Sequence, residues 1–125
     1  RDVSLDLMVN VMSFGFKNGV PLDADFMFDV WFLANPYYEL ELRSQTGLDT
    51  SVSEYVLEQP KALETVESIS TLMEKWIPLH AAAGKTFLTV AIGCTGGQHR
   101  SVAITQALVV SLNERFTLVT AMHRD

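Results

Sequence analysis

The sequence predicts a single α/β domain whose sheet is at least partly parallel. Two apolar runs, at 86–92 and 116–122, flank a segment at 100–113 whose apolar residues recur at helical spacing. A strand, helix and strand of this length form a βαβ unit, with parallel strands and a right-handed crossover. The 125 residues are 48% hydrophobic and 10% aromatic, which excludes a disordered chain and supplies one hydrophobic core. We therefore expect one domain over residues 1–125.

Two apolar runs in the first third of the chain predict further strands. The run at 5–12 (LDLMVNVM) is broken by a glycine-containing loop at 13–19, and the run at 26–33 (FMFDVWFL) ends before Asn35 and Pro36. Both runs are short and rich in large apolar residues, as expected for buried strands.

Two helices are expected between these strands and the βαβ unit. Asp49 is placed to cap a short helix over 50–57. From Pro60 onward, apolar residues recur at steps of three and four, which predicts a long amphipathic helix. Pro78 should kink or end this helix, and Gly84 should stop it.

The charge of the chain is unevenly distributed. The formal net charge is −6, but residues 1–75 carry thirteen acids and five bases, whereas residues 76–125 carry two acids and four bases. The second part also holds all three histidines, which are His80, His99 and His123. The acidic total argues against a general nucleic-acid binder. The uneven distribution predicts any anion chemistry in the second part; the alternative is a chance distribution of few charges.

Other compositional features concern the compartment and the extent of the protein. A single cysteine forms no internal disulfide, and no apolar run approaches the roughly 20 residues of a membrane span. We therefore expect a cytoplasmic protein without a membrane partner. The chain starts without methionine and stops just after an apolar run, as expected of one domain from a longer protein.

The loop GCTGGQHRS at 93–101 is the strongest candidate site. It joins the best strand to the following helix and has three glycines in five positions, so that backbone amides can turn toward one point. The helix N-terminus adds unpaired amides and a positive dipole end. Arg100 offers a planar fork for two phosphate oxygens, and His99 and Thr95 add donors. These features predict a phosphate or carboxylate site; the alternative is a tight turn without a ligand.

Neighbouring strands should contribute to the same site, because ligands of α/β sheets bind at the carboxyl ends of parallel strands. The first strand would deliver Ser13 and Lys17 to this edge, and the last strand would deliver His123 and Arg124. Both contributions require strands parallel to 86–92.

Two nucleotide and phosphate motifs were tested against their context. The triplet Gly84-Lys85-Thr86 imitates the end of a P-loop, but Leu79 stands where that motif needs glycine and a strand follows instead of a helix. The P-loop interpretation is rejected.

The spacing of Cys94 and Arg100, Cys-x5-Arg followed by serine, is that of cysteine-dependent phosphatases. In these enzymes a thiolate attacks phosphorus while arginine holds the oxygens. Gly93 replaces the usual histidine, and no general acid can be assigned. A phosphatase is therefore the alternative function, and a pocket-wall role for Cys94 is favoured.

Two further groups of residues are weaker candidates for a functional site. Asp23, Asp25 and Asp29 have oxygen ligands for a hard cation, but a solvated loop edge is favoured, and no metal is expected. The segment NPYY at 35–38 has aromatic rings that a partner could use, although a packed turn is favoured.

Several motifs occur together in one order along the chain. They are SFGFK at 13–17, DAD at 23–25, FDV at 28–30, NP at 35–36, TGLD at 46–49, GK at 84–85, GCTGGQHRSV at 93–102 and HRD at 123–125. This set closely resembles the C-terminal domain of the RapZ/YvcJ family, the RNase adapter and nucleotide-binding proteins of bacteria. The resemblance covers nearly all of the chain, and the loop at 93–102 is its most specific part.

The resemblance implies a phosphofructokinase-subdomain-like fold and a non-catalytic regulatory domain. Such a domain would sense glucosamine-6-phosphate or a related nucleotide sugar, with no cofactor of its own. ATP or GTP would bind to an N-terminal P-loop domain of the longer protein. In members of the RapZ type, the adapter presents a small regulatory RNA to an endoribonuclease, and family members self-associate, which implies a homo-oligomer. By matching positions, the sugar phosphate would be held by Cys94, Thr95, Gly96, Gly97, His99 and Arg100, with Ser13, Lys17, His123 and Arg124 as neighbours.

The sequence departs from the family pattern in two respects. Family members usually carry arginine and proline where this chain has Trp31 and Ala34. The basic tail of the RNA-binding members has no counterpart, and nine bases are outnumbered by fifteen acids. RNA binding needs several phosphate contacts, so these counts favour the small-molecule role.

Overall fold

A four-stranded, entirely parallel sheet organises the domain. The computed structural model describes residues 7–125, and its strands lie in the order β2-β3-β1-β4. These are β1 (Met8–Gly15), β2 (Phe26–Asp29), β3 (Phe87–Cys94) and β4 (Val119–His123). β1 pairs in parallel with both β3 and β4, and β2 pairs with β3. The predicted α/β class and parallel βαβ unit are confirmed.

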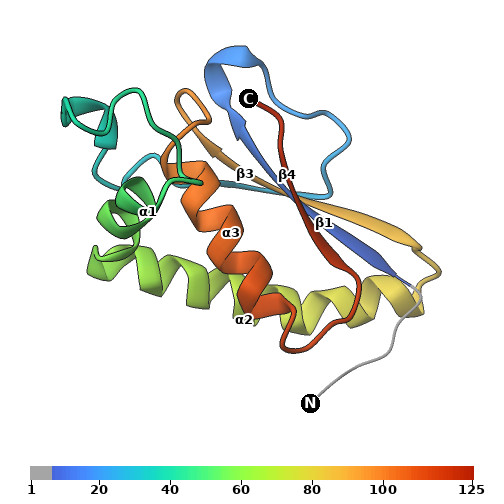
Figure 1. The fold of residues 1–125 in the computed structure, drawn as a ribbon. Coiled ribbons are helices and arrows are strands. Elements are labelled where there is room, and N and C mark those ends of the chain that lie inside the picture. The colour runs from blue at the N-terminus through green and yellow to red at the C-terminus, as the bar shows by residue number, and fades with distance from the viewer. Residues whose placement is uncertain (1–6) are drawn as a thin grey trace.

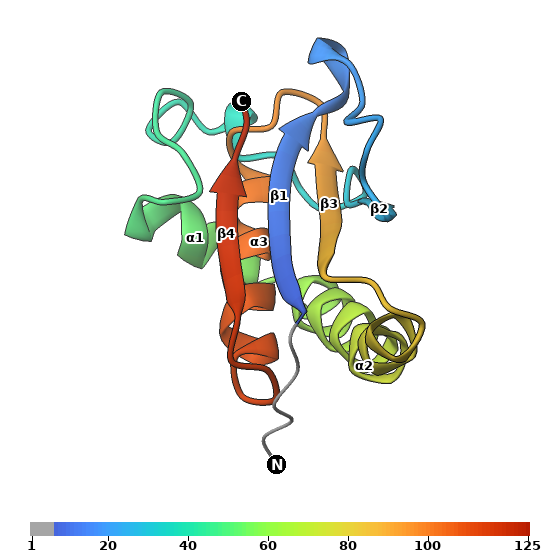
Figure 2. The ribbon, with the colours of Figure 1, turned by 90° about the vertical axis from the view of Figure 1, so that its right-hand side faces the viewer.

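The three helices lie on the same side of the sheet (Figures 1 and 2). They are α1 (Thr50–Leu57), α2 (Pro60–Ala82) and α3 (Arg100–Leu112). α3 contacts β1, β3 and β4 and packs beside α1 and α2. Its Ile104 and Leu108 are fully buried against Val11 and Val90 in the core. The domain is therefore a two-layer structure with α3 at its centre.

The opposite face of the sheet carries methionines. Val9 and Val11 are buried under the helices, so the alternate residues Met8 and Met12 point to the other face. The register aligns Met8 with Phe87 and Met12 with Met122, which are both partly exposed. No helix covers this face within residues 7–125 (Figure 2).

The strands differ from their predicted limits near the sheet edge. β1 extends to Gly15 because its ladder with β3 continues to the pair Gly15–Cys94. β2 ends at Asp29, four residues early, because the carboxylate of Asp29 accepts a hydrogen bond from the Trp31 amide and closes a turn. β4 covers residues 119–123 instead of 116–122. Residues 5 and 6 of the predicted first strand lie outside the described residues.

α2 does not end at Pro78 but continues to Ala82. The last turn remains helical to Ala82 because it packs onto the sheet side, where the His80 ring lies 5.4 Å from that of Phe26. The helix stops at Gly84, as predicted, with a φ of 100°. The amide of Gly84 donates to the Ala81 carbonyl and that of Lys85 to the His80 carbonyl, which is the Schellman pattern.

The predicted short helix α1 is confirmed, but its cap differs from the prediction. The Asp49 side chain accepts a hydrogen bond from the Thr46 amide at 2.8 Å and none from the helix. It therefore closes the 46–49 turn. The Gly47 amide of this turn donates to the Gln98 carbonyl at 2.8 Å, which fixes the turn against the start of α3.

The end of β1 crosses the loop after β3 at backbone contact. A Cβ on Gly15 would lie 2.4 Å from the Gly96 carbonyl carbon, and a Cβ on Gly97 would lie 2.4 Å from the Gly15 nitrogen. Gly97 also has a φ of 80°, which L-residues rarely adopt. No side chain fits between the two segments, so glycine is required on both sides of the crossing.

Replacing Gly15 with alanine should therefore destabilise the domain by about 1–3 kcal/mol, because backbone atoms would have to move apart. Gly96→Ala is the matched control, since its Cβ would meet only the Lys17 Cε at 3.9 Å. Urea unfolding should show a lower midpoint for Gly15→Ala and a nearly unchanged midpoint for Gly96→Ala. Equal midpoints would refute the crossing constraint.

Candidate anion and ligand pocket

A pocket of about 820 Å³ lies at the carboxyl edge of the sheet. This is where ligands bind in parallel α/β folds, because loops from several strands meet there. The pocket is lined by Lys17, Asn18, Asn35, Tyr37, Tyr38, Arg43, Cys94, Thr95, Gly96, Gly97, Gln98, His99, Arg100, Arg124 and Asp125. Eight of the ten residues predicted for the site line it; Ser13 and His123 do not.

The glycine loop is fastened to the segment after β1. The Lys17 amide donates to the Thr95 carbonyl at 3.2 Å, and Gly97 makes the crossing with Gly15. α3 begins at Arg100 without a side-chain cap from His99. Of its first amides, that of Ser101 donates to the Cys94 Sγ at 3.4 Å. The buried Nε2 of His99 has no hydrogen-bond partner among the described residues. A helix N-terminus with its positive dipole end suits an anion.

The Arg100 guanidinium binds backbone carbonyls, whereas the sequence predicted that it would hold two phosphate oxygens. The residue is only 4% exposed, and its Nη1 donates to the carbonyls of Trp31 at 2.6 Å and Leu33 at 3.1 Å. Its Nε is buried without a partner. Arg100 therefore holds the segment after β2 against α3, and only part of its donor set remains for a ligand. The departure at Trp31 does not affect this contact, because the backbone carbonyl makes it.

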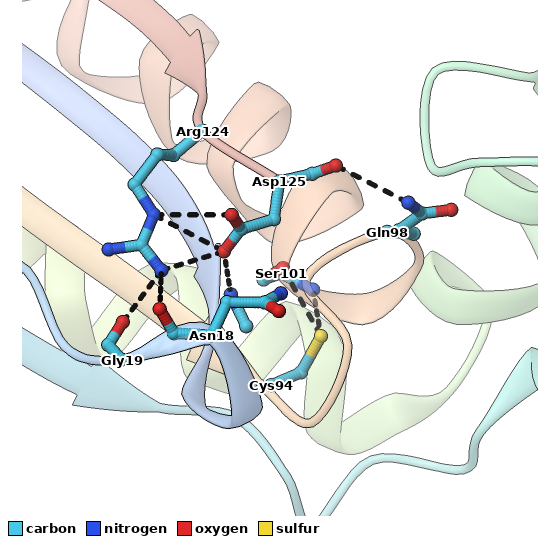
Figure 3. A network of polar contacts seen from close by, with 8 residues as sticks. Asn18, Gly19, Cys94, Gln98, Ser101, Arg124 and Asp125 are labelled. Atoms are coloured by element: carbon cyan, nitrogen blue, oxygen red, sulfur yellow. Dashed lines mark hydrogen bonds and ion pairs between the residues drawn. The ribbon is translucent and has the colours of Figure 1, made fainter.

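Cys94 borders the pocket but is only 2% exposed. Its Sγ lies 3.2 Å from the Ser101 hydroxyl, to which it donates, and accepts from the Ser101 amide at 3.4 Å (Figure 3). The side chain also belongs to the hydrophobic core cluster. This position fits the predicted pocket-wall role better than an exposed nucleophile.

Arg124 and Asp125 connect the end of β4 to the turn after β1. The Arg124 Nη2 donates to the Gly19 carbonyl at 2.6 Å and pairs with the Asp125 carboxylate at 2.8 Å (Figure 3). The same carboxylate accepts the Gly15 amide at 2.8 Å. The hydrogen bond from Arg124 is the main reason that the pKa of Asp125 is lowered. Asp125 thus neutralises much of the charge of Arg124.

Lys17 remains the cation best placed for a ligand. It lies in the 3₁₀ turn Phe16–Asn18, and its Cε approaches the position above Gly96. Within residues 7–125 its ammonium has no ion-pair partner, in contrast to Lys85, which pairs with Asp25 at 2.9 Å. Lys17 therefore places an uncompensated positive charge beside the glycine loop.

Ser13 and His123 lie behind the pocket, between the sheet and α3. The fully buried Ser13 hydroxyl is 2.7 Å from the His123 Nδ1, and the His123 Nε2 is 3.0 Å from the Gln106 Oε1. Since the amide oxygen is an acceptor, Nε2 carries a proton. The Ser13 hydroxyl can donate or accept, and burial lowers the pKa of His123, which favours the neutral ring. Both residues support strand ends and do not line the site.

The pocket has an aromatic and cationic wall, of which the sequence offered the 35–38 rings as the less favoured alternative and gave no sign of Arg43. In the 35–38 segment only Pro36 is buried; Tyr37 is 49% and Tyr38 76% exposed, so the predicted packed turn is wrong for the rings. The Arg43 guanidinium lies 4.6 Å from the centre of the Tyr37 ring, and its Nε donates to the Tyr37 carbonyl at 2.8 Å. Arg43 stands in the acidic part of the sequence and has no motif around it, so no local signal indicates it.

The acidic candidates do not form a metal site among the described residues. Asp25 pairs with Lys85 and accepts the Thr89 amide at 2.8 Å. Across residues 7–125, no group of three potential ligands (His, Cys, Asp or Glu) could hold a metal ion. In the same residues, no helix has the length and apolarity needed to cross a membrane.

Comparison with known proteins decides the family. The sequence model of the RapZ C-terminal domain matches residues 7–125. The chain belongs to this family. It is 50% identical over 115 residues to a nucleotide-binding protein of Pseudomonas fluorescens (strain Pf0-1), which covers 92% of this chain and 40% of the relative. Nucleotide-binding proteins of Shewanella halifaxensis and Shewanella loihica are 46% and 47% identical, covering 96% and 98% of this chain and 42% and 44% of theirs. The RapZ-type domain described here thus spans about two fifths of the length of these relatives.

Replacing Arg100 with alanine should destabilise the domain by about 1–3 kcal/mol, because two carbonyls lose a charged donor and a buried volume is vacated. Arg43→Ala is the control, since Arg43 is exposed and its guanidinium contacts the nearby Tyr37. Thermal unfolding should show a lower melting temperature for Arg100→Ala and a nearly unchanged one for Arg43→Ala. A wild-type melting temperature for Arg100→Ala would show that its contacts to residues 31 and 33 are dispensable.

The lowered pKa of His123 predicts a pH dependence of stability. Unfolded His123 takes up a proton near pH 6.5, whereas the folded ring resists it, so stability should fall as the pH drops below about 6.5. The pKa of Asp125 is lowered from 3.8, so its contribution is lost only at more acidic pH. Urea unfolding between pH 8 and 5 should show a shallower decline for His123→Gln. An equal decline in the stability of the wild type and of His123→Gln would exclude His123 as the source of the pH dependence.

Proposed function

We propose that this domain is a non-catalytic regulatory module that binds a phosphorylated amino sugar, such as glucosamine-6-phosphate, or a related nucleotide sugar. The observation that carries the proposal is the convergence of the glycine loop, the N-terminus of α3 and Lys17 on one pocket. Backbone amides, a helix dipole and an ammonium group are the usual partners of a phosphate.

The charges around the pocket support an anionic ligand despite the acidic total. Its lining includes Lys17, Arg43, Arg100 and Arg124 and a single carboxylate, that of Asp125. Asp125 is already paired with Arg124. A small phosphate therefore meets a locally positive surface on a chain whose formal net charge is −6.

The amino-sugar assignment is a proposal that follows the RapZ resemblance. The exposed Thr95 hydroxyl and the side-chain amides of Asn18, Asn35 and Gln98 offer several polar partners for the sugar hydroxyls. The buried Cys94 thiol gives the cysteine-dependent phosphatase no accessible nucleophile, so binding without turnover is favoured.

The activities of the longer protein are also proposals. The relatives are named nucleotide-binding proteins, and we expect ATP or GTP to bind in a P-loop domain outside this chain. Homo-oligomerisation, a cytoplasmic location and an RNase adapter role, with a small RNA and an endoribonuclease as partners, are expectations of the same kind. The net charge of −6 favours the small-molecule role for this domain.

Calorimetry with glucosamine-6-phosphate should test the pocket. Lys17→Ala should weaken binding about tenfold or more, because a charge-assisted hydrogen bond contributes roughly 1.5–3 kcal/mol. Lys75→Ala is the control, because it removes the same charge from an exposed position on α2. Equal affinities of the two variants, or an absence of binding to the wild type, would reject the proposal.

A further inference from the structure

The exposed tyrosine pair is a feature of the pocket that binding of a phosphate group does not require. Tyr37 and Tyr38 line the same pocket as the glycine loop, and their rings meet edge to face, 6.0 Å apart at 84°. The core does not need these rings, because Pro36 is the buried residue of the turn. Two adjacent aromatic rings in a polar pocket offer flat apolar surface to a ligand.

The turn that carries the rings is fixed by its own hydrogen bonds. The Asn35 side-chain oxygen accepts from the Tyr37 amide at 3.0 Å, and the Asn35 carbonyl accepts from the Tyr38 amide at 3.2 Å. The Glu39 amide donates to the Pro36 carbonyl at 2.9 Å. Because the backbone is ordered before a ligand arrives, binding needs little further ordering of this segment.

Arg43 gives the two rings different roles. Its guanidinium lies 4.6 Å from the Tyr37 ring centre, so it occupies the neighbourhood of that ring. Among residues 7–125 no cation lies over the Tyr38 ring, and this ring is the more exposed of the two. Tyr38 is therefore the ring available for stacking, and Arg43 adds positive charge beside it.

The size and polarity of the pocket fit a ligand with several parts. Its volume of about 820 Å³ lies in the upper part of the range for small-molecule sites. The glycine loop and Lys17 suit phosphate, whereas Tyr38, Arg43 and Asn35 suit a flat base with polar edges.

From this arrangement we propose that Tyr38 forms a base-stacking subsite and that the preferred ligand is a nucleotide sugar, with its diphosphate at the glycine loop. This inference rests on the proposed function, since it assigns the ligand class to the same pocket. It is distinct from nucleotide binding in a P-loop domain, because every residue involved lies in this chain.

Calorimetry with UDP-N-acetylglucosamine, UDP and glucosamine-6-phosphate should test the subsite. The two uridine ligands should bind the wild type at least fivefold more tightly than the sugar phosphate. Tyr38→Ala should weaken the uridine ligands about fivefold or more and leave glucosamine-6-phosphate unchanged, because stacking on a base depends on the ring. Tyr38→Phe keeps the ring and should bind like the wild type.

Leu40→Ala is the matched control, because Leu40 is an exposed apolar residue two positions away that does not line the pocket. Saturation-transfer NMR should place the uracil protons of UDP closest to the protein, and Tyr38→Ala should reduce that transfer.

The outcomes separate this inference from the proposed function. The stacking subsite alone would be overturned if the uridine ligands bind no more tightly than glucosamine-6-phosphate, or if Tyr38→Ala leaves their affinity unchanged. If Lys17→Ala leaves the affinity of every phosphate ligand unchanged, the proposed function is overturned as well. Tyr38-dependent binding of a uridine dodecamer, without binding of UDP or UDP-N-acetylglucosamine, would assign the ring to RNA and reject the nucleotide-sugar subsite.

Discussion

The backbone crossing of Gly15 and Gly97 is the contact on which the rest of the site depends. Because no side chain lies between β1 and the loop after β3, the backbone atoms of the two segments are in direct contact. The crossing positions Lys17 over Gly96 and leaves the Gly15 amide open to the Asp125 carboxylate. The end of β4 is thereby fastened to the same place. Three parallel strands consequently end in one rigid edge.

Charge around this edge is assembled from distant parts of the chain. The loop and helix N-terminus come from residues 93–100, but Lys17 and Arg43 come from the first 75 residues, whose formal net charge is −8. Arg124 is largely neutralised by Asp125, and Arg100 is turned toward backbone carbonyls. The positive character of the pocket therefore depends mainly on Lys17 and Arg43, which form no ion pair among residues 7–125.

The pocket combines the candidate phosphate site at the glycine loop with an aromatic wall. Different contacts hold these two parts in place. The glycine loop is positioned by the sheet and α3, whereas the tyrosines stand on a short turn that Asn35 stabilises locally. A ligand that reaches both would link the segments after β1, β2 and β3. Such a link would couple occupancy of the pocket to the arrangement of the whole sheet edge.

The sequence by itself determined the α/β class, the parallel strands, α1 and the position of the glycine loop, because each rests on local periodicity or on a glycine pattern that few structures tolerate. Tertiary structure decided the rest. Packing of His80 against Phe26 carries α2 past Pro78, and burial converts Arg100 from a phosphate fork into a support for the Trp31 and Leu33 carbonyls. Ser13 and His123 turn toward α3, where Gln106 completes their hydrogen bonds, instead of toward the ligand. Tyr38 and Arg43 reach the pocket only through the course of the chain after β2, and no local pattern encodes that course.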